Sequence, residues 1–383
     1  MDFRFTEEQE QLRAVLCEFA RRELLPHYAE WDRTGAFPRH LWREMGRLGL
    51  TGLRVSPQYG GSGADCVTTG IAAEEIARGD FNAAYAVMLN ALLAEVLEAH
   101  ASDAVRREWL APMASGERLV AIAITEPGAG SDVANLAARA VRDGDRYIIT
   151  GEKSGISLAS VADAFVVFAK TQADAGARGV SAFLVPRETP GVEVHRYKDM
   201  GNVAIGRGSV FFDHVEVATD YRIGEENRAF YQLMKGFDLS RVLICLQCLG
   251  AAMQSLDETA EHVKRRHAFG RPLAQFQGVA FPLVEYYTKL EMIRWFSYRA
   301  LWLRDRGLPH TKEASMCKWL GPQVAAQAIH ESILLHGHYG YTKDLPLEQR
   351  LRDVIGLEIG DGTAQTQKIV IAREWLGKPY KPR

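Results

Sequence analysis

This 383-residue sequence has few long apolar runs and almost no net charge. No apolar run approaches the ~20 residues that a membrane-spanning helix needs. The first residues carry no apolar signal region, so we expect a cytoplasmic protein without a membrane partner. The 46 Lys and Arg nearly balance the 48 Asp and Glu, and the net charge of −2 predicts no general attraction to nucleic acid.

Metal-binding and redox motifs are also missing. Of the five cysteines, Cys245 and Cys248 form a Cys-x-x-Cys, but no second pair of Cys or His stands at zinc spacing. The 11 histidines contain no His-Glu-x-x-His. Cys245 and Cys248 lie in an apolar helical run, where free Cys packs as a small hydrophobic residue. The sequence therefore indicates no metal and disfavours a redox role for Cys245 and Cys248.

The hydrophobic periodicity changes twice along the chain. Residues 6–115 and 226–376 have helical spacing, and Thr6 with Gln9 forms a capping-box signal at the first helix. Residues 119–217 contain short β-type runs separated by turn signals, with no helices between them. That middle pattern favours an antiparallel barrel or sandwich over a parallel nucleotide-binding sheet. We therefore predict three domains, at residues 1–117, 118–222 and 223–383.

Five of the expected helices have residue bounds. They run at about 82–100, 102–114, 276–306, 310–336 and 364–376.

A turn that follows a short β-type run is the most informative stretch. Residues 119–124 lead into Pro127, Gly128 and Gly130. Proline fixes φ and glycine has no Cβ, so backbone N–H groups at such a turn can come close to a flat or anionic ligand. Alone, a Pro-Gly-x-Gly of this kind is more often an ordinary connection between a strand and a loop.

The surroundings of this turn carry a family resemblance. Thr125 and Ser131 bracket it with hydroxyls that can donate to ring carbonyls or nitrogens. The whole string 122–132 resembles the flavin-cradling loop of the acyl-CoA dehydrogenase family. Further segments similar to that family recur in order at 59–63, 240–244, 266–272, 336–341 and 362–363. The resemblance implies an α+β multidomain fold with an all-α N-terminal domain, a middle antiparallel β-barrel and a C-terminal four-helix bundle.

The resemblance also implies bound FAD. The positions that match its contacts are Ile122, Ile124, Thr125, Gly130, Ser131, Ile156, Ser157, Arg266, Phe269, Gln277, Gly337, Thr363 and Gln365. Arg266 and Phe269 would come from a neighbouring subunit of a homotetramer. A buried diphosphate needs a delocalised cation with a fork of donors, which Arg266 provides. The alternative is that residues 264–267 form a solvated run of charge.

Substrate contacts are implied in the same way. The positions assigned to an acyl-CoA or acyl-carrier-protein thioester are Asn90, Ser131, Asp238, Arg241, Gly362 and Arg373. Asp238 and Arg241 match the coenzyme A end, although Asp238 could simply begin a helix, whose N-terminus favours a carboxylate. Asn90 interrupts an apolar run and needs a partner if it is buried, so an internal hydrogen bond is its alternative role.

The family reaction removes a proton α to the thioester carbonyl while a hydride passes from the β-carbon to the flavin, and electrons continue to an electron-transfer flavoprotein. Most members use a Glu as the base, and the matching residue here is Asp361. Ser240 stands at the family's other base position and cannot serve. Asp is one methylene shorter, which sets its carboxylate back by ~1.5 Å. A misplacement of ~1 Å can cost ~100-fold in rate. A turn-forming Asp is the structural alternative.

Two glycines replace aromatic residues of the family, Gly155 beside the flavin and Gly360 before the base. Together with the shorter Asp361 they remove bulk from one pocket. We therefore expect a roomier site, suited to a branched, cyclic or carrier-bound acyl group.

Other functions remain open at this point. A flavin oxidase that resembles nitroalkane oxidase also uses Asp as base, and an open flavin face at Gly155 could admit O₂. A flavin-bearing DNA-binding protein, similar to the family's alkylation-response branch, is a third reading. That branch relies on a basic C-terminal extension, which this sequence does not show.

Overall fold

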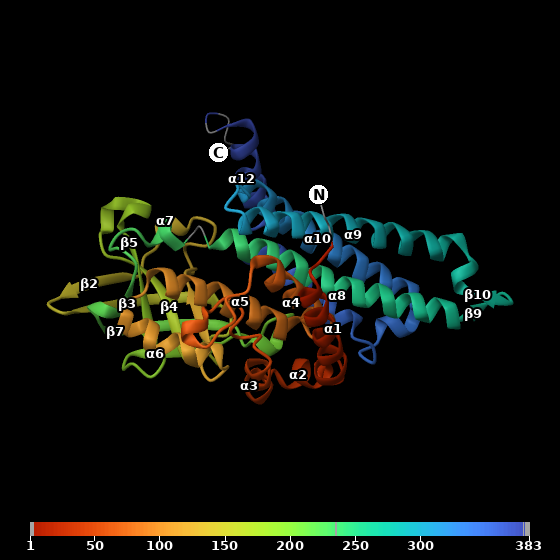
Figure 1. Cartoon of the computed structure of the whole chain (residues 1–383), viewed down its shortest axis with the longest axis horizontal. Coiled ribbons are helices and arrows are strands. Elements are labelled where there is room, and N and C mark those ends of the chain that lie inside the picture. The colour runs from red at the N-terminus through yellow and green to blue at the C-terminus, as the bar shows by residue number, and fades with distance from the viewer. Residues whose placement is uncertain (1–3, 234–235, 378, 380–383) are drawn as a thin grey trace.

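The structure is a computed structural model that describes residues 4–233, 236–377 and 379. The outermost residues of the first and last predicted domains lie outside this range. A sheet occupies one end of the molecule, long C-terminal helices extend to the other end, and the N-terminal helices lie along both (Figure 1). The α+β multidomain architecture predicted from the sequence is confirmed, and the boundaries given for its domains stay predictions.

Four of the described N-terminal helices begin at residues whose side chains satisfy free backbone N–H groups. Thr6 and Gln9 form the predicted capping box, with Gln9 N donating to Thr6 Oγ1 at 3.2 Å. Asp80 and Ser102 cap two further helices in the same way. The bounds are α1 Glu7–Phe19, α2 Tyr28–Thr34, α3 Arg39–Arg47, α4 Cys66–Gly79, α5 Phe81–His100 and α6 Asp103–Ala114.

Within the described residues, the middle of the chain forms one eight-stranded sheet. Its strands are β1 Val120–Ala123, β2 Arg139–Asp143, β3 Arg146–Ile156, β4 Ala164–Lys170, β5 Val180–Pro186, β6 Val192–Arg196, β7 Gly208–Ala218 and β8 Arg222–Ile223. The order is β6-β7-β3-β2-β4-β5-β8, and β1 pairs with β4.

The sheet departs from the expected pattern in one respect. Most pairs are antiparallel, but β1 pairs with β4 in parallel, with Val120 opposite Ala164, and β2 also meets β4 in parallel. Parallel neighbours cannot be joined by a tight hairpin, and here β2 and β3 intervene in the chain. A prediction from short-range turn signals could not detect such a pairing.

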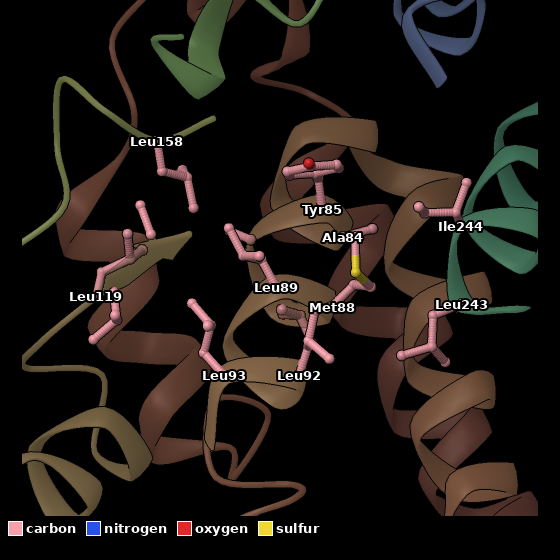
Figure 2. Packing of buried hydrophobic residues seen from close by; sticks show 14 of the residues in the cluster. Ala84, Tyr85, Met88, Leu89, Leu92, Leu93, Leu119, Leu158, Leu243 and Ile244 are labelled. Atoms are coloured by element: carbon pink, nitrogen blue, oxygen red, sulfur yellow. The ribbon is translucent and has the colours of Figure 1, made fainter. Parts of the chain in front are cut away.

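The C-terminal part consists of long helices. Its elements are α7 Ala229–Leu233, α8 Phe237–Arg265, β9 His267–Ala268, β10 Arg271–Pro272, α9 Gln277–Asp305, α10 Thr311–Leu335, α11 Leu347–Ile359 and α12 Ala364–Leu376. The helix α8 packs against α10, α4 and α5. In Figure 2, α5 lies between Leu119 and Leu158 of the sheet region and Leu243 and Ile244 of α8. The core is therefore continuous from the sheet to the helices.

The prediction that no apolar run approaches the length of a membrane span needs correction. Both α5 and α8 are long and apolar enough to cross a membrane by length and composition. In each, 89% of the apolar window is buried inside the structure. Their apolar surface is thus covered by other parts of the protein, and they serve as core helices.

Candidate active site

The turn after β1 rests on a buried ion pair. Lys153 Nζ, on β3, donates to Glu126 Oε1 at 2.7 Å and to the Ile124 carbonyl at 2.9 Å. Glu126 also accepts hydrogen bonds from the backbone N–H groups of Ala137 and Ala138. Burial lowers the pKa of Lys153 to about 8, against the opposing effect of Glu126. These contacts fix the backbone of the turn from its inner side.

The outer side of the same turn is open. Thr125 is half-buried, and Gly130 and Ser131 are exposed. A Cβ built on Gly128 or Gly130 would meet nothing within 4 Å. A ligand can therefore approach the backbone closely, as the sequence motif predicts.

The end of β3 lies beside this turn. Ser154 N donates to the Thr125 carbonyl at 2.8 Å, which ties the two segments together. The pairing of β3 with β7 is irregular after Lys153, and Gly155 there has φ +65°, a conformation that favours glycine. Ser157 follows the end of β3 and is half-buried. Ile122 and Ile124, also half-buried, belong to the strand end and turn that β3 borders.

Asp361 occupies a tight turn between α11 and α12. Its φ of +54° is left-handed, which Asp tolerates better than most residues, and Gly362 follows with φ +94°. Lys318 Nζ, from α10, donates to the carbonyls of Leu357 at 2.7 Å and Gly362 at 3.1 Å. Thr363 then caps α12. A buried cation therefore holds the turn that carries the predicted base.

The surroundings of Asp361 suit a group that exchanges a proton. Tyr85 Oη donates to Asp361 Oδ2 in a long hydrogen bond of 3.5 Å. Burial raises the pKa of Asp361, while Lys318, the Tyr85 hydrogen bond, Arg241 and Arg207 act in the opposite direction. The carboxylate is thus more basic than an exposed Asp and is still surrounded by donors and positive charge.

Tyr85 links the base to the end of β3. It is buried on α5, between Leu158 and Ile244 in Figure 2. Burial and then the charge of Asp361 raise the pKa of the Tyr85 hydroxyl, whereas a hydrogen bond with Ser157 and the charge of Arg207 lower it. The predicted base and the predicted flavin neighbour Ser157 are therefore brought together around one side chain.

Asp238 and Arg241 lie at the start of α8 and contact each other. Arg241 Nη1 donates to Asp238 Oδ1 at 2.6 Å, and Thr311 Oγ1 donates to Asp238 Oδ2 at 2.6 Å. Both carboxylate oxygens are thus engaged inside the protein. Arg241 Nε is buried and has no partner among the described residues. Arg373 acts electrostatically on Arg241, and its own side chain contacts the adjacent Glu374.

Asn90 is placed in the packed interior. It is 1% exposed, and its amide donates to the carbonyls of Thr51 at 2.6 Å and Met113 at 3.5 Å. Its Oδ1 has no partner among the described residues. The internal hydrogen-bonding role accounts for these contacts, and no contact places Asn90 beside Asp361.

The remaining predicted FAD positions form a separate group. Arg266 and Gly337 line a hollow of about 170 Å³, and Phe269 is 96% exposed with φ +49°. Gln277, which begins α9, is exposed. The β9–β10 hairpin next to this group projects at the end of the molecule opposite the sheet (Figure 1). A single chain therefore does not bring this group to the turn at Thr125.

Gln365 is exposed on the first turn of α12, near Asp361 in sequence.

Three side chains of this site were missed by the sequence analysis. Tyr85 and Lys318 each lie within an apolar helical run, where a tyrosine gives no distinct signal. Arg207 precedes β7 and follows Gly206, which has φ +61°. A buried lysine needs a partner, so Lys318 in its apolar setting could have been flagged.

Known protein families match this architecture. The N-terminal domain model of acyl-CoA dehydrogenases matches residues 6–117, the middle domain model residues 121–215 and the C-terminal domain model residues 227–376.

Individual relatives agree over nearly the full length. The chain is 36% identical over 376 residues to the short-chain specific acyl-CoA dehydrogenase of Clostridium acetobutylicum, covering 97% of this chain and 99% of the relative. It is 33% identical over 377 residues to a caffeyl-CoA reductase–Etf complex subunit of Acetobacterium woodii, covering 98% of this chain and all of the relative.

A solved structure shows that the fold is also similar to that of the family. Butyryl-CoA dehydrogenase from Megasphaera elsdenii superposes with a TM-score of 0.95 and 30% identity, over 98% of this chain and 100% of the other. The chain belongs to the acyl-CoA dehydrogenase family, whose members are FAD-dependent oxidoreductases that act on CH–CH groups.

Proposed function

We propose that the chain catalyses α,β-desaturation of a short acyl-CoA, with Asp361 as the base. In this reaction the Asp361 carboxylate takes the proton from the α-carbon. The electron pair of that C–H bond becomes the second bond between the α- and β-carbons, and the hydride leaves the β-carbon. Bound FAD would supply the hydride acceptor.

The observation that carries this proposal is the convergence on Tyr85. Its hydroxyl lies 3.5 Å from Asp361 Oδ2 and also interacts with Ser157 at the end of β3. A carboxylate on one side and, on the other, the end of β3 that borders the open turn are what a reaction between a thioester and a flat cofactor needs. The raised pKa of Asp361 makes it a better proton acceptor than an exposed carboxylate.

The described residues fit a flavin at the turn. Gly128 and Gly130 leave open space where side chains would stand, and the hydroxyls of Thr125 and Ser131 are accessible. Below them, the Glu126–Lys153 pair keeps the backbone in place. We infer that Thr125, Ser131, Ile156 and Ser157 hold the isoalloxazine, in agreement with the resemblance in sequence.

We infer that the diphosphate and adenosine are held by another copy of the chain. Arg266, Phe269, Gln277 and Gly337 are exposed at the end opposite the sheet, where they cannot serve the turn of their own chain. An exposed phenylalanine and an exposed arginine three residues apart in the sequence are suited to an aromatic and anionic ligand. A homotetramer remains part of this proposal.

The electron acceptor is proposed to be an electron-transfer flavoprotein. A relative that is 33% identical is named as a subunit of a caffeyl-CoA reductase–Etf complex. The oxidase alternative requires O₂ to reach the reduced flavin. A second alternative concerns the substrate: a carrier-protein thioester in place of acyl-CoA leaves the chemistry at Asp361 unchanged.

One titration separates these functions. Purified flavoprotein is mixed anaerobically with a panel of acyl-CoAs while the flavin absorbance is followed. We expect bleaching with a long-wavelength charge-transfer band, and slow reoxidation in air unless an electron-transfer flavoprotein is added. Rapid H₂O₂ production in air would identify an oxidase. Protein that binds no FAD, or is not bleached by any acyl thioester, would contradict the proposal.

A further inference from the structure

The space beside Gly155 is occupied by a charged side chain. A Cβ on Gly155 would come within 3.2 Å of Arg207 Nη2. The guanidinium therefore lies against the β3 backbone, two residues before Ser157. Because Gly155 has no side chain, Arg207 can reach a position that a larger residue there would block.

Arg207 also belongs to the surroundings of the base. Its positive charge acts on both the Asp361 carboxylate and the Tyr85 hydroxyl. These two groups come from different parts of the fold, the turn before α12 and the middle of α5. The guanidinium therefore lies close enough to the proposed base to act on it electrostatically.

The protein satisfies only part of this guanidinium. Arg207 Nη1 lies 3.5 Å from Asp199 Oδ1, an ion pair longer than a good hydrogen bond. Its side chain is 35% exposed, and among the described residues no hydrogen bond is recorded for Nη2. The backbone is fixed nearby, since Tyr197 N donates to the Arg207 carbonyl at 2.8 Å. A positioned cation, with no hydrogen-bond partner for Nη2 among the described residues, is therefore left beside Gly155 at the end of β3.

A purely hydrocarbon acyl group would fit these surroundings poorly. It would remove water from the guanidinium without offering an acceptor in return. A carboxylate offers both of its oxygens to the planar donor fork of an arginine. Arg207 also occupies part of the space beside Gly155, so the aromatic side chain absent at that position does not simply enlarge the pocket.

We propose that Arg207 is a specificity-determining residue that binds a carboxylate at the distal end of a short acyl group, so that the substrate is the thioester of a dicarboxylic acid. This inference rests on the proposed dehydrogenase function and specifies its substrate class.

The test compares thioesters of equal carbon number. Glutaryl-CoA and valeryl-CoA, and then succinyl-CoA and butyryl-CoA, are used to reduce the flavin anaerobically in a stopped-flow instrument. The rate constant of reduction divided by the dissociation constant is expected to be at least about tenfold higher for the carboxylated member of each pair, the size of one charge-assisted contact. In Arg207→Met this preference is lost, mainly because the dissociation constant for glutaryl-CoA rises. The rate and dissociation constants for valeryl-CoA change little. Arg207→Lys should retain part of the preference.

Matched controls separate this role from general damage. Arg142→Met, which removes an exposed arginine of β2, should leave the preference unchanged. Equal or faster reduction by the hydrocarbon thioesters in the unmodified protein would overturn the inference and leave the dehydrogenase function standing. An Arg207→Met protein that slows equally with both members of a pair and has a shifted flavin spectrum would overturn it in favour of a contact with the cofactor. If no thioester bleached the flavin, both the inference and the function beneath it would fail.

Discussion

Lys318 Nζ donates a hydrogen bond to the Gly362 carbonyl at 3.1 Å, one residue beyond Asp361. The same ammonium group donates to Leu357 O at 2.7 Å, at the end of α11. Lys318 is 2% exposed, and its burial lowers its pKa. One cation thus joins α10 to both sides of the turn that positions the carboxylate.

Removing this support should slow the reaction more than it weakens binding. In Lys318→Met the two carbonyls lose their donor and the turn is free to shift. A displacement of ~1 Å at the base costs ~100-fold, so we expect the rate of flavin reduction to fall by about 10- to 100-fold, with a much smaller change in substrate affinity. Lys343→Met, at an exposed lysine, is the control. An unchanged rate of reduction in Lys318→Met would show that the turn needs no such support.

Tyr85 should set the pH dependence of the base. Its hydroxyl donates to Asp361 and lowers the pKa of that carboxyl, which burial raises. The ionised base is lost as pH falls through this pKa, so activity declines on the acid side. Tyr85→Phe removes a lowering influence and should move the acid limb of kcat/KM to higher pH, by less than about one unit for a hydrogen bond of this kind. A limb that stays in place or moves to lower pH would contradict the assignment.

The buried ion pair beneath the turn should contribute more to the free energy of unfolding than an ion pair at the surface. Lys153 and Glu126 are almost fully buried, and breaking such a pair by removing one partner typically costs ~3–5 kcal/mol. Lys153→Met should show this loss in urea unfolding and should retain less FAD. Adding Glu126→Gln should recover part of the loss, because the uncompensated charge is then gone. As a control, Arg146→Met breaks a half-exposed pair with Glu216 and should cost under ~1 kcal/mol. Equal losses in the two single variants would refute this account.

A buried carboxyl away from the site should make stability depend on pH. Asp353 is 1% exposed, and its oxygens accept hydrogen bonds from Asn202 N and Asn82 Nδ2. Burial raises its pKa to about 8; the Asn202 hydrogen bond opposes this, and the charges of Asp80 and Asp32 add to it. The folded protein then binds this proton more tightly than the unfolded chain, whose Asp has a pKa of ~3.9. The contribution of Asp353 is favourable at low pH and is lost progressively between about pH 4 and pH 8.

Asp353→Asn isolates this effect, because the amide does not ionise in that range. The free energy of unfolding of the unmodified protein minus that of Asp353→Asn should fall as pH rises from 5 to 8, by about 1.4 kcal/mol per pH unit at most. Urea unfolding at several pH values measures the difference. A difference that is constant with pH, or that grows, would mean that Asp353 ionises as an ordinary carboxyl.

The helices could be predicted from the sequence because their signals are local. The expected helix at 276–306 is observed as Gln277–Asp305, and that at 82–100 as Phe81–His100. Periodic apolar residues and capping side chains lie within a few positions of one another, so no distant contact is needed to read them. The parallel pairing of β1 with β4 depends on segments about forty residues apart and left no such signal.

The residues of the candidate site also differ in whether local sequence signals or distant contacts reveal them. Asp361, Thr125 and Ser157 could be predicted as site residues because they stand in short motifs similar to those of the family, and these assignments stay predictions. Tyr85 and Arg207 reach the same region only through the packing of α5 against the sheet and through the left-handed backbone at Gly155 and Gly206. Nothing in their immediate sequence indicates that they meet.

The central claim is that Asp361 removes the α-proton, and the rate of flavin reduction in Asp361→Asn tests it most directly. The anaerobic half-reaction is followed with saturating acyl-CoA in the unmodified protein, in Asp361→Asn and in Asp361→Glu, after each has been shown to hold FAD and to bind the thioester. We expect bleaching to slow by at least ~100-fold in Asp361→Asn, because a positioned base typically contributes 10²–10⁴-fold, and to return in part in Asp361→Glu. Bleaching of Asp361→Asn at the unmodified rate would contradict the mechanism.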